Sequence, residues 1–360
     1  MRKYHIDNLR IFCILLLFPY HTAMIFNAWG EQFYIHGNSL SCLTLPMSLI
    51  YPWWMNLLFT IAGISAAYSL KKRSLKEFAK ERCKKLLIPF LTGIVFIIPV
   101  QSYIADVFHN NYSGGYFEHY KIFFTRFTDL TGYDGGFTPA HMWFMLYLFI
   151  ISMLMLPIIS FFNKRKLKIS GTKIKLIHIL PLFLIILLMT PLLEIGGKSF
   201  GEAFACFALG FFLISIDEIQ NLLEKNCLLL TFLFIGILCV HSLLIISGMQ
   251  SGILWDIEYR IFVWFGILAF LGLGKRFLNR ANKLLNYLSQ AAFPLYFFHQ
   301  SILVITGYWF LKLNVNVLIQ FLLIMSLSFI GSVLCYEIFR KFKITRFLFG
   351  IKSKHTKLVR

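Results

Sequence analysis

The sequence predicts an all-α protein, a polytopic transmembrane helical bundle of about ten helices with both termini in the cytoplasm. Three observations predict this class. Hydrophobic residues make up 58% of the 360 residues and charged residues only 14%, whereas about a quarter of the residues in soluble domains are charged. The apolar residues form runs of about 20, the length that crosses a bilayer. The cationic residues gather between alternate runs.

Ten apolar runs follow one another, and no soluble domain separates them. The expected helices cover 9–29, 43–70, 86–107, 141–162, 176–194, 201–216, 227–247, 259–274, 286–309 and 316–339. The sixth and the eighth are short for a span, so a tilt, a break or a misplaced boundary is expected there. The chain is therefore interpreted as a single membrane domain over 1–360, which ends in a basic cytoplasmic tail at 340–360.

The distribution of positive charge gives the expected orientation. Thirty of the 35 Lys and Arg residues lie in the six segments that are cytoplasmic if the amino terminus is cytoplasmic. Such a bias is typical of cytoplasmic loops, so both termini are expected on that side. The net charge of +19 is then explained by topology and by contact with anionic membrane lipids, and no nucleic-acid partner is expected.

Metal chemistry is not indicated. The seven cysteines form no CxxC pair, and neither HExxH nor another paired-histidine spacing occurs. No zinc site is therefore expected. The long external segment 108–140 mixes aromatic, glycine and polar residues. It is interpreted either as a lid or sugar-stacking surface, or as a loop that lies on the membrane interface.

The first apolar run, IDNLRIFCILLLFPYHTAMIF at residues 6–26, carries Arg10, Pro19 and His21. In a continuous helix, residues eleven apart lie within about 20° of each other and about 16 Å apart along the axis. Arg10 and His21 are therefore expected on one face, with His21 deeper in the membrane. Pro19 leaves the carbonyl of Leu15 without its helical partner, so a kink is expected before His21. A histidine at this depth is a candidate functional residue; the alternative is a histidine that only packs helices together.

The ninth apolar run repeats this pattern. Its stretch FPLYFFHQ contains Pro294, Tyr296 and His299, with Tyr296 and His299 at adjacent positions on one face. His299 is expected about 20 Å from the cytoplasmic end of the helix, close to the depth of His21. Two bent helices that each present a histidine at similar depth suggest a shared cavity.

A third group of residues lies on the cytoplasmic side. The stretch KKRSLKEFAKERCKKLLIPF places Arg73, Arg82 and Lys85 between the second and third helices. The simplest interpretation is an ordinary positively charged cytoplasmic loop. The alternative is a site for a polyanionic ligand, because guanidinium groups pair with phosphate.

Together these residues resemble the acyltransferase 3 family of integral membrane O-acyltransferases, and within it the branch of glucan-modifying C-type (succinyl)transferases. Arg10 and His21 match the family's Arg and His that are separated by ten residues. Similar stretches follow along nearly the whole chain: LFTIAGISAAYSLKKR, FAKERCKKLLIPF, HMWFMLYLFIISMLMLP, FALGFFL, FPLYFFHQ and YEIFRKFKITRFLFGIK. Three positions depart from the family pattern, because Lys85 replaces arginine, Ala62 replaces serine and Ser301 replaces the proline after His299.

The resemblance implies transfer of an acyl group, such as acetyl or succinyl, from an acyl-CoA to a hydroxyl of an extracytoplasmic glycan or lipid-linked saccharide. Acyl-CoA would be the donor substrate and no cofactor would be bound. The expected location is a bacterial inner or plasma membrane. His21 would be the base or a transient acyl carrier, and Arg10 would position the donor or hold the first helix. Arg73, Arg82 and Lys85 would be candidates for the phosphates of coenzyme A.

The resemblance also nominates His141, Trp143, Tyr296 and His299 for lining the acceptor side or stabilising the oxyanion. An interface residue is the alternative for His141, and a membrane anchor is the alternative for Trp143. A secondary transporter or flippase for an anionic or glycan substrate is the rival function. The two halves of the sequence show no matched pair of broken helices, which such transporters commonly have.

Overall fold

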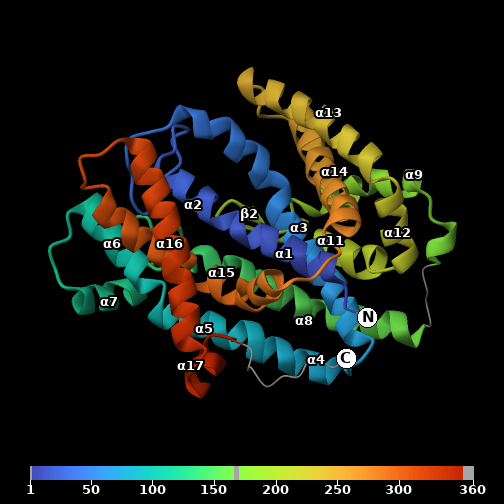
Figure 1. The fold of residues 1–360 in the computed structure, drawn as a ribbon, viewed down its shortest axis with the longest axis horizontal. Helices are drawn as coiled ribbons and strands as arrows, with labels where there is room; N and C mark the ends of the chain where they lie inside the picture. The colour runs from blue at the N-terminus through green and yellow to red at the C-terminus, as the bar shows by residue number, and fades with distance from the viewer. Residues whose placement is uncertain (1, 166–169, 352–360) are drawn as a thin grey trace. The chain divides into compact units, whose positions relative to one another are not determined.

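The computed structural model describes residues 2–165 and 170–351, and this part of the chain is almost entirely helical (Figure 1). Its only strands are β1 (Glu194–Ile195) and β2 (Lys198–Ser199), which form a short antiparallel hairpin. The predicted all-α class is thus confirmed. The location of the termini and the division into one domain with a basic tail stay predictions, and residues 352–360 of that tail lie outside the described residues.

Eight helical segments in the described ranges are long and apolar enough to cross a membrane. They are Tyr4–Ile25, Ser41–Leu70, Leu75–Asn110, Ala140–Lys164, Cys227–Ile246, Ile253–Phe277, Lys283–Phe310 and Val317–Phe339. A ninth is formed if Phe200–Ile214 and Asp217–Lys225, which meet at a 98° bend, make one broken span. The protein is therefore a multi-pass membrane protein, close to the predicted helix count.

Four expected helices differ clearly from the structure in length. The third, expected over 86–107, belongs to the longer segment Leu75–Asn110. The fifth ends at Met189, so the apolar helix Leu176–Met189 is shorter than a full span. The sixth stops at the 98° bend. The eighth, by contrast, extends over Ile253–Phe277 and needs no tilt or break to reach spanning length. Polar residues at the ends of the apolar run concealed its true length.

The structure forms two compact units, each assembled from three stretches of the chain. The first unit comprises Met1–Cys13, Leu45–Glu81 and Tyr147–Leu285. Its helices, some of which run a few residues beyond these limits, are α1 (Tyr4–Leu15), α3 (Thr44–Leu70), α4 (Leu75–Arg82), α8 (Trp143–Lys164), η4 (Gly171–Lys173), α9 (Leu176–Ile179), η5 (Leu180–Leu182), α10 (Phe183–Met189), α11 (Phe200–Leu209), the π-helical η6 (Gly210–Ile214), α12 (Asp217–Lys225), α13 (Cys227–Ile246) and α14 (Ile253–Phe277).

Close helix packing and buried polar contacts hold the first unit together. Helices α13 and α14 form a helical hairpin, drawn in yellow and orange in Figure 1. Gly63 of α3 lies against the backbone of Phe207 in α11, and Gly210 lies against the backbone of Thr60. Small residues at such a crossing let two membrane helices approach closely. Two of the stretches quoted above, LFTIAGISAAYSLKKR and FALGFFL, therefore contribute to one helix contact.

The second unit comprises Ile14–Thr44, Arg82–Leu146 and Asn286–Arg360. Its elements are α2 (Leu17–Ile25), η1 (Ser41–Leu43), the π-helical η2 (Cys83–Leu87), α5 (Ile88–Phe96), α6 (Pro99–Asn110), α7 (Tyr116–Thr125), η3 (Ala140–Met142), α15 (Lys283–Phe310), α16 (Val317–Phe339) and α17 (Lys343–Leu348). This unit contains every histidine that the sequence singled out as a site residue.

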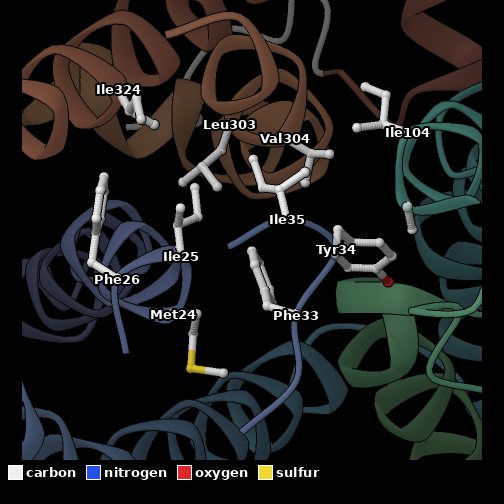
Figure 2. Packing of buried hydrophobic residues seen from close by; sticks show 11 residues of the cluster. Met24, Ile25, Phe26, Phe33, Tyr34, Ile35, Ile104, Leu303, Val304 and Ile324 are labelled. Carbon is white, nitrogen blue, oxygen red and sulfur yellow. The ribbon is translucent and has the colours of Figure 1, made fainter. Parts of the chain in front are cut away.

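A buried apolar cluster fixes α2 in the second unit. It is formed by Met24, Ile25, Phe26, Phe33, Tyr34, Ile35, Ile104, Ala105, Leu303, Val304 and Ile324. Figure 2 shows Leu303 and Val304 of α15 pointing toward Ile25 and Ile35. These side chains, several of them on α2, α6, α15 and α16, pack closely against one another. The helix that carries His21 therefore has a defined position.

The first membrane segment is interrupted at Leu16, between α1 and α2. Pro19 lies three residues further on, and its ring nitrogen has no hydrogen to give to the preceding turn. The expected interruption before His21 is therefore present. The eleven-residue periodicity between Arg10 and His21 does not run through an unbroken helix, so their common face stays a prediction.

Candidate active site

Two histidines from distant parts of the sequence meet in the second unit. Nδ1 of His21, on α2, lies 3.2 Å from Nε2 of His299, on α15. Their ring centroids are 4.9 Å apart and the ring planes are tilted by 52°. The sequence predicted similar depths for these two residues, and the structure brings them into direct contact.

Hydrogen bonds to backbone carbonyls fix the protonation of both rings. Nδ1 of His21 lies 3.1 Å from the carbonyl oxygen of Leu17, and Nδ1 of His299 lies 2.6 Å from that of Tyr296. A carbonyl oxygen only accepts, so each neutral imidazole carries its hydrogen on Nδ1. The Nδ1–H of His21 is then shared between Leu17 and Nε2 of His299. The lone pair of His21 is on Nε2.

His141 is the third histidine of this group. Its ring centroid lies 4.8 Å from that of His299. Its Nε2–H donates to the carbonyl of Phe297 at 3.1 Å, and the hydroxyl of Tyr296 donates to the carbonyl of His141 at 2.7 Å. Two bonds in opposite directions thus tie η3 to α15. His141, Tyr296 and His299 were all predicted site residues, and they lie together.

The three histidines differ in their exposure. His299 is 0% exposed and His141 is 5% exposed, whereas His21 is only half-buried. The ring of Phe33 stacks beside His21 at a centroid distance of 6.3 Å. His21 is therefore the most exposed member of the group. In the ranges that the structure describes, no three His, Cys, Asp or Glu residues are placed to hold a metal ion.

Gln101 and Ser301 connect α15 to the break between α5 and α6, and sequence reasoning missed this role. Nε2 of Gln101 donates to the hydroxyl of Ser301 at 2.6 Å, and that hydroxyl donates to the carbonyl of Ile97 at 2.9 Å. Ser301 stands where the family pattern has proline, which has no hydroxyl. This departure from the pattern was the available signal, because a polar replacement inside a span calls for a partner.

A second polar group, also missed, organises the segment between α6 and η3, which the sequence predicted to be external. Asp106 is buried, with only 1% of the residue exposed. Its Oδ1 accepts from Nδ2 of Asn110 at 2.7 Å and from Nη1 of Arg126 at 3.2 Å, and its Oδ2 lies 3.2 Å from Nε2 of His119. Tyr34 adds a bond to this segment through Thr131. Sequence reasoning missed these residues because they are scattered through a segment without periodicity.

Acidification is expected to loosen this external segment. Burial lowers the pKa of His119 below its usual 6.5, and the opposing effect of Asp106 does not offset it. When the segment is open, the imidazole of His119 is exposed and takes up a proton near pH 6.5. When the segment is closed, the same imidazole is buried and takes up a proton only at lower pH. The closed segment is thus most stable above pH 6.5 and loses stability as the pH falls below it.

Hydrogen exchange measures this effect. Amide exchange in 116–126, corrected for its intrinsic pH dependence, is expected to accelerate between pH 7 and pH 5.5. His119→Phe keeps a ring against Tyr103 and Tyr112 and should remove most of the acceleration. An unchanged pH dependence in this variant would show that His119 is not responsible.

The predicted cationic residues have defined partners in the first unit. Nη1 of Arg10 pairs with Asp7 at 3.1 Å, and its Nη2 donates to Ser65 at 2.8 Å. Arg73 pairs with Glu81 and donates to Ser69. These contacts define the position of both guanidinium groups; neither tests a role in binding a donor.

The remaining predicted site residues lie in the second unit. Arg82 precedes the π-helical turn η2, and Lys85 lies within it with an exposed side chain. Trp143 begins α8, and its ring contacts that of Phe144. The roles of these three residues stay predictions.

Comparison with known proteins shows the family of this chain. The acyltransferase 3 model, described as an acyltransferase domain, matches residues 3–337. Proteins named glucans biosynthesis protein C from Salmonella paratyphi B, Salmonella heidelberg and Salmonella enteritidis PT4 are each 26% identical over 173 residues. The match covers 46% of this chain and 41% of each relative, so the chain spans less than half the length of these relatives. No solved structure matches it.

A multi-pass helical bundle with histidines that meet inside the protein defines a membrane-embedded site for acid–base or nucleophilic chemistry. The match over residues 3–337 shows which class this is. The chain belongs to the acyltransferase 3 family.

Proposed function

We propose that this protein transfers an acyl group, such as acetyl or succinyl, from an acyl-CoA to a hydroxyl of an extracytoplasmic carbohydrate. Membership of the family supports acyl transfer in general. The names of the relatives, which refer to glucans biosynthesis, support a glucan or another glycan as the acceptor. The single observation that carries the chemical part is the contact between His21 and His299, since it leaves the lone pair of the half-buried His21 on Nε2.

The proposed step uses His21 as a general base. A sugar hydroxyl is a poor nucleophile until its proton is removed. Nε2 of His21 takes this proton while the hydroxyl oxygen forms a bond to the thioester carbonyl carbon. The carbon–sulfur bond then breaks, and the coenzyme A thiolate recovers the proton from His21. The products are the ester and free coenzyme A, and His21 returns to its neutral form.

The donor is proposed to bind through its phosphates on the cytoplasmic side. Arg73, Arg82 and Lys85 supply positive charge next to the second and third spans, and phosphate groups pair well with such side chains. Arg10 is proposed to orient the donor, since Asp7 and Ser65 hold its guanidinium. Acyl-CoA is a substrate in this scheme, and no resident cofactor is invoked.

The acceptor is proposed to approach from the external segments of the second unit. Phe33 stacks beside His21 and also contacts the ring of Tyr133, which belongs to the segment that Asp106 organises. Aromatic rings are suitable surfaces for a sugar. A free glycan and a lipid-linked saccharide are both compatible, and surrounding membrane lipids would complete the site. Trp143 is proposed to line this side. The proposed location is a bacterial inner or plasma membrane.

Inverted membrane vesicles test this function. Vesicles that contain the protein are loaded with a glucan oligosaccharide in their lumen, which corresponds to the extracytoplasmic side, and labelled acetyl-CoA or succinyl-CoA is added outside. Transfer of label to the oligosaccharide, absent from vesicles without the protein, is the expected result. If no donor is consumed and a labelled anionic solute moves across the vesicle membrane instead, the protein is a transporter and the proposal is wrong.

A further inference from the structure

We propose that His299 is a positioning residue for the transfer reaction: it accepts the Nδ1–H of His21 and stabilises the imidazolium that forms on His21. The inference rests on the proposed function and adds a specific task for a residue that does not touch the reacting atoms. Sequence reasoning placed His299 only on the acceptor side or near the oxyanion. The geometry of the histidine pair indicates a different role.

Neighbouring groups orient His299 for this task. Its Nδ1–H donates to the carbonyl of Tyr296 at 2.6 Å, so its Nε2 is an acceptor, 3.2 Å from Nδ1 of His21. Phe18 packs edge-on against the ring at a centroid distance of 5.8 Å, and His141 does so at 4.8 Å. A ring held on several sides stays aligned with His21 without losing further side-chain entropy during the reaction.

Burial makes this hydrogen bond sensitive to charge. His299 is 0% exposed, and inside a protein a polar contact is electrostatically stronger than in water. While His21 is neutral, the contact joins two neutral rings. Once Nε2 of His21 holds the proton of the acceptor hydroxyl, the same Nδ1–H belongs to a cation, and such charge-assisted bonds are about twice as strong.

The consequence is selective stabilisation of the transition state. The bond from His21 to His299 gains strength only as the proton moves from the hydroxyl to Nε2, and it weakens again when the coenzyme A thiolate takes that proton. An interaction that is stronger in the transition state than in the ground state raises kcat and leaves substrate binding unchanged. His299 itself is unsuited as the base, because it is fully buried and its lone pair faces His21.

Two replacements of His299 distinguish this role from a merely structural one. His299→Phe keeps the ring but removes the acceptor, and kcat for acyl transfer is expected to fall about 10- to 100-fold, the scale of one lost hydrogen bond to a charged group. The KM values for acetyl-CoA and for the glucan oligosaccharide are expected to change by less than about twofold, since the loss is confined to the transition state. His299→Gln offers an amide oxygen near the position of Nε2 and should restore much of the rate.

A measurement without substrates separates this inference from the proposed function. Diethyl pyrocarbonate acylates the lone-pair nitrogen of neutral imidazole, and mass spectrometry of the purified protein follows its reaction with His21. His299→Phe is expected to slow this reaction about fivefold, the scale of one lost hydrogen bond. The exposed His178 serves as the internal reference and should react at an unchanged rate.

The outcomes are distinct. If the wild-type protein transfers no acyl group, the proposed function fails, whereas slower acylation of His21 in His299→Phe still supports the contact. The inference about His299 is overturned if His299→Phe keeps the wild-type kcat and the wild-type acylation rate. It is also overturned if His299→Phe and His299→Gln are equally impaired while both unfold at the wild-type temperature. In that case the rate would not depend on whether residue 299 offers an acceptor atom to His21.

Discussion

Replacing His21 by alanine is expected to reduce acyl transfer by about 10²- to 10⁴-fold, the usual contribution of a general base. The remaining activity would come from the donor and acceptor being held together. The measurement is the rate of label transfer from acetyl-CoA to a glucan oligosaccharide in vesicles with equal amounts of protein. Because His21 is half-buried and its side chain is small, the variant is expected to fold.

A matched control uses another histidine. His178→Ala removes an exposed imidazole from the first unit and should leave the transfer rate within twofold of the wild type. Full activity of His21→Ala would exclude the assigned base. Acid quenching of the reaction, followed by mass spectrometry, distinguishes the two chemical roles: an acyl group on the peptide with His21 indicates an acyl carrier, and its absence during steady turnover indicates a base.

Adding a single methyl group at Gly63 or Gly210 is expected to destabilise the first unit by about 1–3 kcal/mol for each substitution. A Cβ at Gly63 would overlap the carbonyl oxygen of Phe207, and one at Gly210 would overlap that of Thr60. Backbone atoms cannot rotate away as a flexible side chain can, so the two helices must separate. Thermal unfolding in detergent measures the loss for Gly63→Ala and Gly210→Ala.

The double variant adds a sharper test. Both glycines serve one crossing of α3 with the segment formed by α11 and η6, so the first methyl group already separates the helices. The combined loss should be smaller than the sum of the single losses, as for other pairs of residues in contact. Gly236→Ala in α13 is the control, because nothing lies within 4 Å of the added Cβ. If Gly63→Ala is as harmless as Gly236→Ala, the close crossing is not needed for stability.

The spanning helices were predictable because the bilayer demands long apolar runs, and most such runs became the expected helices. The breaks were only partly predictable. Pro19 indicated a break in the helix close to Leu16, since proline removes a backbone donor. The 98° bend after Ile214 was not expected as such, although the sixth run was known to be short. Apolar side chains look alike in sequence whether they face lipid or protein.

The candidate site was predictable where one residue alone is costly in a membrane. His21 and His299 stood out for this reason, and their similar expected depth suggested a shared cavity, but it did not predict their direct contact. His141 and Tyr296 were chosen by resemblance, and the structure places them beside His299. Gln101 was missed, because an uncharged amide in an apolar run gives a weaker signal and its partner is 200 positions away.

Two hydrogen bonds join η3 to α15, one from the hydroxyl of Tyr296 to the carbonyl of His141 and one from the ring of His141 to the carbonyl of Phe297. They have a further consequence for how such proteins diversify. They hold His141 on α15, so its place does not depend on the external segment that precedes it. Insertions, deletions or new side chains between 111 and 139 would leave the three histidines in register. If the acceptor binds along this segment as proposed, its preference can change from one descendant to the next while the three histidines keep their positions.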